Sequence, residues 1–321
     1  MFALNNKKKP SLGILITYCD ERDLLTRCLR SIKLQTVLVD EVIVFDDNSN
    51  FPAKNYIPSD FPLPVRIIHS DKRLGLACAR NILLKESVSD FIHFQDSDDI
   101  LMPRWSETVL RTFYQDDFDF IIANCLSLSP EKELGKINFF LLRKEMAGDD
   151  VSFCIRNPIP TEAGVYRRSK VLKIGGFDEE VLFSEDYDFH IRLVYSGVRI
   201  KFINEPLILI FVRKEGRTMS NYLQTYLWGA QILNHHLDLL FPKYRFDISD
   251  TLVSFGIMIT RQGGWSEAKN VFKLAKKIGP PLYLNFKNSS LAYRICLRFF
   301  GPLLTERFRL FFSKLKYLLL R

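Results

Sequence analysis

Three carboxylates lie within four residues of one another, at Asp96, Asp98 and Asp99, directly after the short apolar run Phe91–Phe94. The run indicates a buried strand, and open α/β sheets bind ligands at the carboxyl ends of their strands. Because like charges repel, a hard divalent cation would stabilise such a cluster, and Mg²⁺ and Mn²⁺ prefer oxygen ligands shared with substrate phosphates. A second interpretation is an acidic turn before a helix, with Asp99 as its cap and Pro103 in the first turn.

Two earlier apolar runs also end in polar side chains. The first run, Leu12–Thr17, ends at Thr17-Tyr18, and the second, Glu41–Phe45, ends at Asp46-Asp47. Each cluster taken singly has an ordinary explanation, a helix entry for the first and an Asx turn for the second. Their recurrence at consecutive strand ends indicates a nucleotide site. The sequence has neither a Gly-x-Gly-x-x-Gly after its first strand nor a Walker-type Gly-Lys-Ser/Thr, which weakens a dinucleotide or P-loop interpretation.

Strands and helices are predicted to alternate along the first half of the chain. The predicted strands are Leu12–Thr17, Glu41–Phe45, Val65–His69 and Phe91–Phe94, and the predicted helices are Glu21–Leu34 and Leu76–Leu84. This alternation predicts parallel βαβ units packed into a layered sheet. Polar groups that follow the strands then meet at one edge of that sheet.

A second acidic cluster opens a helix in the second half of the chain. Gly175–Glu179 is a turn signal, and Ser184-Glu185-Asp186-Tyr187-Asp188 starts a helix that is predicted to run to about Tyr195. Ser184 as a cap, with acids in the first turn, is the structural interpretation. A second interpretation is a general base, because a carboxylate here could remove the proton of a substrate hydroxyl.

Charge and composition bound the class of protein. The chain has 321 residues, 47% of them hydrophobic, which suits one large α/β domain with a smaller appendage. Residues 291–321 hold seven basic residues and one acid, a net charge of +6, whereas the other 290 residues carry +2. The basic character therefore belongs to the tail and does not indicate nucleic-acid binding by the main domain.

Targeting and redox signals point to the cytoplasm. The six cysteines are scattered without zinc-like spacing, and free thiols in a reducing compartment explain them. Residues 1–10 are polar and lysine-bearing, unlike a secretory signal. No apolar run approaches the ~20 residues of a membrane span, so we expect any membrane contact to be peripheral.

An ordered set of motifs resembles glycosyltransferase family 2. The set is SLGILITYCDE, EVIVFDDNS, LGLACARN, HFQDSDD, GGFDE and SEDYDFHIRL, spread over about Ser11 to Ser220. The resemblance implies an α/β protein with the GT-A fold, a Rossmann-like mixed, mostly parallel sheet flanked by helices, with a C-terminal helical appendage. It also implies an inverting enzyme that uses a nucleotide-sugar donor. Ile16 stands where many relatives have Pro, and Asn48 and Asn50 stand where Gly and Asp are common, but neither change removes a charged group.

The resemblance assigns the donor-binding roles. Residues implied to hold the nucleotide base and ribose are Thr17, Tyr18, Glu21 and Asp47, with Arg80 near the nucleotide. Asp96 is implied to lie near the ribose and the metal, and Asp98 to bind the Mn²⁺ or Mg²⁺ that bridges the diphosphate.

The remaining roles fall in the second half. Gly164 begins Gly164–Arg168, which resembles the segment that lies under the donor sugar. Arg213 belongs to a basic loop before Ser220, and the resemblance implies that this loop clamps the diphosphate; an ordinary solvated loop is the alternative. Asp186 is the implied general base, with Glu185 beside it as the alternative. The transferred group is expected to be a hexosyl or N-acetylhexosaminyl unit from a UDP-sugar.

The resemblance fades beyond about Tyr222. We expect residues 1–221 to form the catalytic domain and residues 222–321 a helical region, with helices at Leu223–Leu240 and Thr251–Ile278. After Pro302, one helical face is apolar and is opposed by Arg309, Ser313 and Lys316. Such a helix suits an anionic membrane interface, and docking on the protein or on a second subunit is the alternative.

The expected partners are a nucleotide-sugar donor and a glycan or lipid-linked glycan acceptor in cell-surface polysaccharide synthesis, on the cytoplasmic face of the inner membrane; this rests on family analogy. Two other classes stay open from the sequence. A sugar-1-phosphate nucleotidyltransferase would need a glycine-rich phosphate loop that the sequence lacks. A non-catalytic glycan- or nucleotide-binding module would bind UDP without turnover.

Overall fold

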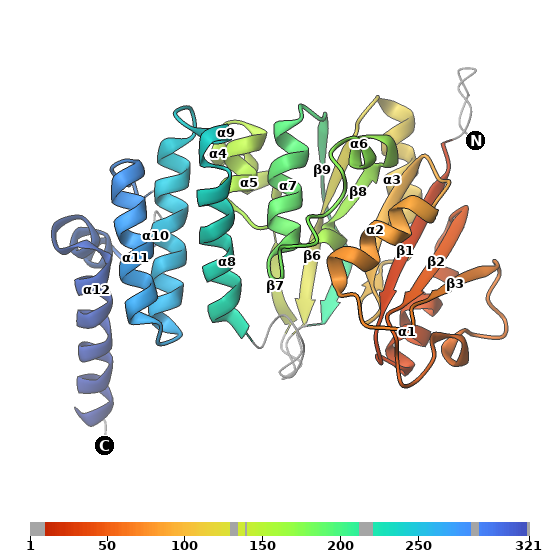
Figure 1. Cartoon of the computed structure of the whole chain (residues 1–321), viewed down its shortest axis with the longest axis horizontal. Helices are drawn as coiled ribbons and strands as arrows, with labels where there is room; N and C mark the ends of the chain where they lie inside the picture. The colour runs from red at the N-terminus through yellow and green to blue at the C-terminus, as the bar shows by residue number, and fades with distance from the viewer. Residues whose placement is uncertain (1–9, 129–133, 139, 212–220, 284–288, 320–321) are drawn as a thin grey trace. The chain divides into compact units, whose positions relative to one another are not determined.

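The chain divides into two compact units. The computed structural model describes residues 10–128, 134–138, 140–211, 221–283 and 289–319 (Figure 1). The first unit comprises Met1–Met146, Ile159–Glu180 and Phe189–Lys214, and the second comprises Ala147–Pro158, Val181–Asp188 and Glu215–Arg321. The second unit thus takes two internal segments and residues 215–221 from within residues 1–221, and the assignment of residues 1–221 to one catalytic domain stays a prediction.

Four parallel strands form the start of the sheet in the first unit. They are β1 (Leu12–Tyr18), β2 (Glu41–Asp46), β3 (Val65–His69) and β4 (Phe91–Asp96), in the order β3-β2-β1-β4. β1, β2 and β4 are almost fully buried, as expected for parallel strands covered on both faces. The helices α1 (Asp23–Lys33) and α2 (Leu76–Glu86) follow β1 and β3, which confirms the predicted alternation.

Five further strands extend this sheet beyond β4 in the described part of the chain, and of their pairings only that of β6 with β9 is parallel. The full order is β3-β2-β1-β4-β8-β6-β9-β5, with β7 paired to β6. The added strands are β5 (Ile100–Leu101), β6 (Phe120–Leu128), β7 (Leu134–Asn138), β8 (Gly164–Arg167) and β9 (Ile200–Phe211). The predicted fold class, a mixed and mostly parallel sheet flanked by helices, is therefore confirmed.

β9 is one continuous strand whose pairing with β6 is irregular. Its register shifts opposite Ala123 and Asn124 of β6. Pro206 pairs there, and proline lacks the N–H that a regular ladder needs. The register shift accommodates Pro206 without a ladder hydrogen bond from its nitrogen, so the strand continues past this residue.

Short elements complete the described part of the first unit and its borders. They are α3 (Trp105–Gln115), α4 (Phe140–Ala147), α6 (Arg168–Lys173), α7 (Glu185–Tyr195) and the 3₁₀ turns η1 (Ala53–Tyr56) and η2 (Thr161–Ala163). The first turn of α7 belongs to the second unit and the remainder to the first.

The second unit is helical and is built around α10 (Arg245–Arg261). Its other helices are α5 (Asp150–Arg156), α8 (Tyr222–His235), α9 (Leu237–Leu240), α11 (Trp265–Ile278) and α12 (Leu291–Leu319). α5, α8, α11 and α12 all pack against α10. The single helix predicted over Thr251–Ile278 is wrong: it is split where Gly263 has φ of 89°, a left-handed conformation that glycine adopts without strain.

α12 consists of two helical segments joined at Gly301, whose φ is 74° and ψ 167°, directly before Pro302. The helix predicted after Pro302 is therefore preceded by a further helical segment that starts at Leu291. Over the ranges that the structure describes, no helix has both the length and the apolar character that a membrane span requires.

Candidate active site

The ends of β1 and β4 place Thr17 and Asp96 opposite each other in the sheet. The Thr17 hydroxyl donates a hydrogen bond to Asp96 Oδ1 at 3.4 Å. Tyr18 is likewise opposite Asp46 of β2. The polar groups predicted to meet at one edge of the sheet do so because the parallel strands are in register.

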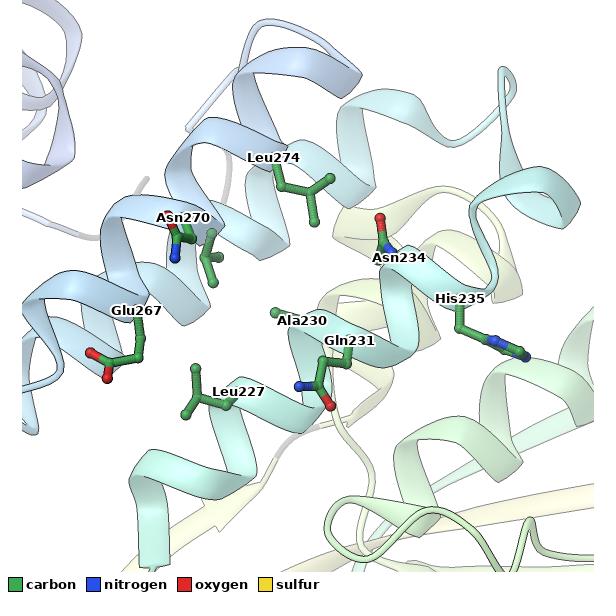
Figure 2. Close-up of a pocket in the computed structure, with 9 residues that line it drawn as sticks. Leu227, Ala230, Gln231, Asn234, His235, Glu267, Asn270 and Leu274 are labelled. Atoms are coloured by element: carbon green, nitrogen blue, oxygen red, sulfur yellow. The ribbon is translucent and has the colours of Figure 1, made fainter.

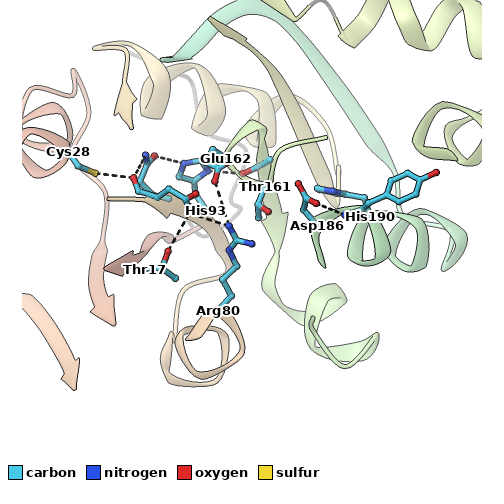
Figure 3. A network of polar contacts seen from close by, with 12 residues as sticks. Thr17, Cys28, Arg80, His93, Thr161, Glu162, Asp186 and His190 are labelled. Atoms are coloured by element: carbon cyan, nitrogen blue, oxygen red, sulfur yellow. Dashed lines mark hydrogen bonds and ion pairs between the residues drawn. The ribbon is translucent and has the colours of Figure 1, made fainter. Parts of the chain in front are cut away.

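Arg80 links this edge to a residue that sequence reasoning missed. Its Nη2 lies 3.2 Å from Asp96 Oδ1 and 3.6 Å from Glu162 Oε1, and its side chain is only 3% exposed (Figure 3). Glu162 is buried in η2, two residues before Gly164. A signal for it existed, since Glu162 is a lone acid among mostly apolar residues between Ile159 and Val165.

The carboxyl groups of Asp96 and Glu162 are hydrogen-bonded to each other, and their pKa values move in opposite directions. Burial raises the pKa of Asp96, but the Arg80 guanidinium and hydrogen bonds from Glu162, Arg80 and Thr17 outweigh it, so its pKa lies below the ordinary value. Burial raises the pKa of Glu162 well above its ordinary value, and the negative charge of Asp96 adds to this. We infer that Glu162 is protonated and donates to an ionised Asp96.

Asp98 and Asp99 make different contacts from Asp96. Arg27 donates to the backbone carbonyl of Asp98 at 2.6 Å, and Asp98 itself is half-buried. Asp99 is buried and accepts from the backbone N–H of Phe211 at 2.9 Å. The interpretation of Asp99 as a helix cap is therefore wrong, since it fixes the end of β9 and α3 begins only at Trp105.

Metal ligation was predicted for Asp96 and Asp98. Among the side chains that the structure describes, no three His, Cys, Asp or Glu residues form a group that could hold a metal ion. Mg²⁺ is usually bound by one or two carboxylates together with substrate phosphates and water. The pKa of Asp96 lies below its ordinary value and its side chain is 33% exposed, so Asp96 and Asp98 fit a cation that completes its coordination with a diphosphate.

Asp47 is buried and holds the entry to α2. Its carboxylate accepts from the backbone N–H groups of Leu74 at 2.6 Å and Gly75 at 3.1 Å. Gly75 has φ of 87°, so the turn favours glycine. Asp47 thereby fixes the start of the helix that carries Arg80.

Tyr18 and Glu21 organise the loop after β1. The Tyr18 hydroxyl donates to the Phe51 carbonyl at 2.6 Å, and burial raises the pKa of this phenol, which keeps it a neutral donor. Glu21 accepts from the backbone N–H of Cys19. Both predicted nucleotide ligands therefore have a contact that shapes the loop.

Gly164 lies where β8 approaches β4. Its carbonyl accepts from His93 Nδ1 at 2.7 Å, and a Cβ at this position would lie 2.0 Å from the Tyr166 hydroxyl oxygen. Any side chain at Gly164 would have to displace the Tyr166 ring. Close packing against Tyr166 therefore requires glycine at position 164.

The predicted catalytic pair, Glu185 and Asp186, lies in the first turn of α7. Glu185 is buried and Asp186 is half-buried. Both belong to the second unit, whereas Asp98 belongs to the first, and the prediction that Asp98 and Asp186 act on one substrate stays a prediction. Arg213 lies outside the described residues.

Three helices of the second unit hold this first turn. Asp188 Oδ1 lies 2.7 Å from His236 Nε2, which follows α8, and both side chains are buried. The Tyr187 hydroxyl donates to the Ile155 carbonyl of α5 at 2.5 Å, and its ring packs edge-on against Phe255 of α10. Ser184, expected as a cap, donates to the Thr225 carbonyl of α8 at 3.1 Å.

The second unit also has a groove of about 470 Å³ between α8 and α11 (Figure 2). It is lined by apolar side chains such as Leu227 and Leu274 and by polar ones such as Gln231, Asn234 and Asn270. None of the predicted site residues lines this groove.

Comparison with known proteins places the chain in a family. The sequence profile described as Glycosyl transferase family 2 matches residues 13–174, half of the chain. The chain belongs to glycosyltransferase family 2 and is a glycosyltransferase. This membership sets aside the nucleotidyltransferase and the non-catalytic binding module as interpretations of the sequence.

Two curated relatives are similar over most of their length. An uncharacterized glycosyltransferase of Haemophilus influenzae is 25% identical over 251 residues, covering 75% of this chain and 82% of the relative. The amylovoran biosynthesis glycosyltransferase AmsE of Erwinia amylovora is 26% identical over 225 residues, covering 69% of this chain and 77% of the relative.

A solved structure shares the fold. The crystal structure of residues 1–349 of S. aureus TarS in complex with UDP-GlcNAc is similar with a TM-score of 0.58. It is 15% identical in sequence, and the match covers 84% of this chain and 92% of that chain.

Proposed function

We propose that this glycosyltransferase moves a sugar, with inversion, from a UDP-sugar to a hydroxyl of a glycan or glycolipid acceptor. The observation that carries the proposal is the Thr17–Asp96–Arg80–Glu162 cluster at the carboxyl edge of the parallel strands. It puts one partly exposed, ionised carboxylate beside a buried guanidinium where α/β sheets bind nucleotides. The complex of TarS with UDP-GlcNAc supports a UDP-linked donor.

In this proposal the first unit binds the donor. Side chains at the ends of β1 and β2 and at the start of α2 surround the base and ribose, and Arg80 balances charge beside them. The proposed donor-binding residues are Thr17, Tyr18, Glu21, Asp47, Arg80, Asp96, Gly164 and Arg213. Several of them act by fixing loops, as the contacts of Tyr18 and Asp47 indicate.

Asp96 and Asp98 would hold Mn²⁺ or Mg²⁺ together with the donor diphosphate. A bound divalent ion would act as a Lewis acid on the charge that develops on the leaving nucleoside diphosphate. The contribution of the chain is to keep Asp96 ionised: Arg80 and the proton on Glu162 favour its charged form.

Asp186 would serve as the general base, with Glu185 next to it as the alternative. An acceptor hydroxyl has a pKa far above 7, so its proton must pass to a carboxylate during attack. The half-buried position of Asp186 supports this role, because an accessible carboxylate can reach an acceptor whereas the buried Glu185 is less accessible.

The proposed product is a cell-surface polysaccharide or glycolipid, made on the cytoplasmic face of the inner membrane. The name of the relative AmsE, a glycosyltransferase of amylovoran biosynthesis, supports a role of this kind. We assign the transferred unit to the hexosyl or N-acetylhexosaminyl class.

The test is a panel of UDP-sugars with Mn²⁺ or Mg²⁺, in which UDP release and UDP binding are measured separately. Asp98→Ala should lose metal-supported donor binding at least about tenfold. Asp186→Asn should bind the donor like wild type and lose transfer by about 100-fold or more, the usual contribution of a general base.

The control is Asp238→Asn on α9, an exposed acid of the second unit, which should change neither quantity. Unchanged transfer by Asp186→Asn and by Glu185→Gln would show that the base lies elsewhere. Donor binding by wild type that ignores added metal would refute the role of Asp98.

A further inference from the structure

α12 exposes a continuous row of large apolar side chains. They form what we call the α12 surface: Leu291, Ile295, Phe299, Phe300, Leu304, Phe308, Phe311 and Phe312. Phe299 is 76% exposed, and Phe311 and Phe312 are 63% and 62% exposed. Monomeric soluble proteins seldom expose contiguous apolar patches of this kind, and such patches usually mark an interaction site.

The row continues across the kink at Gly301. Leu291, Ile295 and Phe299 are four residues apart and share one helical face, as do Leu304, Phe308 and Phe311. The rings of Phe300 and Phe308, one from each segment, lie with their centroids 5.7 Å apart. The kink therefore joins two apolar faces into one surface.

A buried ionic network fixes the kink. Glu306 is fully buried and accepts from Tyr293 of the first segment at 2.5 Å, from Arg309 at 2.6 Å and from Arg261 of α10 at 2.9 Å. Burial raises the pKa of Glu306, but these partners outweigh it, so its pKa lies below the ordinary value. We infer that Glu306 carries a negative charge, which Arg261 and Arg309 balance inside the unit.

Exposed arginines lie on the same faces as the apolar side chains. Arg294 and Arg298 are exposed and follow Leu291 by three and seven residues, and the exposed Arg307 precedes Phe308. Glu306 is the only acid in residues 291–321 of the sequence, and it is buried. The α12 surface therefore offers aromatic side chains and positive charge together, with no exposed negative charge on its own helix.

We propose that the α12 surface docks in the headgroup region of an anionic lipid bilayer. Phenylalanine rings would enter the boundary between headgroups and acyl chains, and the arginines would meet lipid phosphates. A second copy fits less well, because a two-fold interface brings the same patch of both copies together and would set arginines against arginines. This inference does not rest on the proposed function, since binding to lipid is measured without turnover.

The test is flotation of the full chain with vesicles of phosphatidylcholine, with or without phosphatidylglycerol. Wild type should bind only the phosphatidylglycerol vesicles. Arg294→Glu with Arg298→Glu should weaken this binding at least about tenfold, because each basic residue near an anionic surface contributes about 1 kcal/mol. Phe299→Ser with Phe311→Ser should weaken it at least as much, because two exposed rings are lost.

Matched controls separate this surface from general charge and hydrophobicity. Lys273→Glu with Lys277→Glu on α11 makes the same charge change, and Leu239→Ser on α9 removes another exposed apolar side chain. Both should leave vesicle binding unchanged, with thermal unfolding confirming that every variant folds. Deleting residues 302–321 is less informative, because it also removes Glu306 from Arg261 and Tyr293.

Three results would overturn the proposal. These are equal binding to both vesicle types, loss of binding in the controls, and no binding by wild type. If wild type forms oligomers in sedimentation velocity, binds no vesicles and becomes monomeric with Phe299→Ser and Phe311→Ser, the surface joins two copies instead.

Discussion

At the scale of single residues, the proposed chemistry of the first unit depends on one buried guanidinium, that of Arg80, which lies beside two carboxyl groups. Arg80 contacts Asp96 and Glu162, and the two carboxyl groups contact each other. Two ionised carboxylates beside one guanidinium would leave a buried negative charge, which is costly. Protonation of Glu162 makes the cluster neutral and leaves the charge on Asp96.

Replacement of Glu162 tests this arrangement. The raised pKa means that folded Glu162 binds a proton which the unfolded chain releases above about pH 4.3. Wild-type stability should therefore fall as the pH rises above that value. Glu162→Gln has no proton to lose at this position. The difference between its melting temperature and that of wild type should therefore shift in favour of the variant as the pH rises from about 5 to about 8.

The control for this prediction is Glu162→Ala, which leaves buried polar partners unsatisfied and should cost about 1–3 kcal/mol at all pH values. Asp96 does not affect this comparison. Because its pKa is lowered in the folded state, its contribution to stability changes with pH only below about pH 3.9. A melting-temperature difference between Glu162→Gln and wild type that stays constant with pH would contradict a protonated Glu162.

Residue types and spacing identified much of this cluster. Thr17 and Asp96 could be placed together because they end strands that the apolar pattern predicts, and parallel strands align their ends. Glu162 was missed because its partners lie more than 60 residues away in the sequence, and nothing local distinguishes a buried acid from a solvated one. Asp99 was misassigned because its partner, Phe211 of β9, is equally remote.

At the scale of elements, the first turn of α7 is held by contacts with side-chain and backbone groups of the helices α5, α8 and α10. Asp188 and His236 form a buried pair, and Tyr187 and Ser184 bond to carbonyls of α5 and α8. These contacts flank Glu185 and Asp186 on both sides along the chain and so fix the backbone that carries them. His236 is therefore a positioning residue in the proposed mechanism.

His236→Ala should lower kcat by on the order of 10–100-fold, because small misplacements of a catalytic group have effects of this size. UDP binding should be unchanged. His236→Gln can still donate a hydrogen bond to Asp188 and should recover much of the loss. The measurements are kcat, KM and the dissociation constant of UDP.

His235→Ala is the matched control, since the neighbouring histidine is exposed and should be silent. A purely structural role for His236 would lower the melting temperature and UDP binding together, and that result would contradict a positioning role.

The elements were predicted where the apolar period is regular. The parallel strands and the helices of the βαβ units were found because their apolar runs are bounded by clear polar breaks. The break at Gly263 was missed because apolar residues continue at helical spacing on both sides of it. β6 and β8 were not predicted, since β8 lies between β4 and β6 and pairs antiparallel with both, an arrangement that has no signal in the βαβ alternation.

At the scale of the whole chain, charge is concentrated in the last 31 residues, which carry +6 of the total +8. We expect raised salt to weaken binding to anionic vesicles, because screening shortens the reach of exposed charges to about 8 Å at physiological ionic strength. Transfer to a soluble acceptor should respond much less. Parallel salt titrations of flotation and of UDP release measure the two responses.

An equal salt response of the two activities would show that the positive charge also serves the donor site. Wild type and the Arg294→Glu, Arg298→Glu variant should then differ in turnover as well as in flotation. We expect them to differ in flotation alone, because the proposed donor-binding residues lie in the first unit and the two arginines in the second.

The pairing of Asp188 with His236 also bears on how such enzymes can diversify. If recombination replaced everything after residue 221 with an unrelated module, the buried carboxylate of Asp188 would lose its partner His236, close to the proposed base. A viable exchange would have to bring its own imidazole or amide to that spot. Descendants of this chain should therefore inherit the helical region together with the segment that carries Asp188.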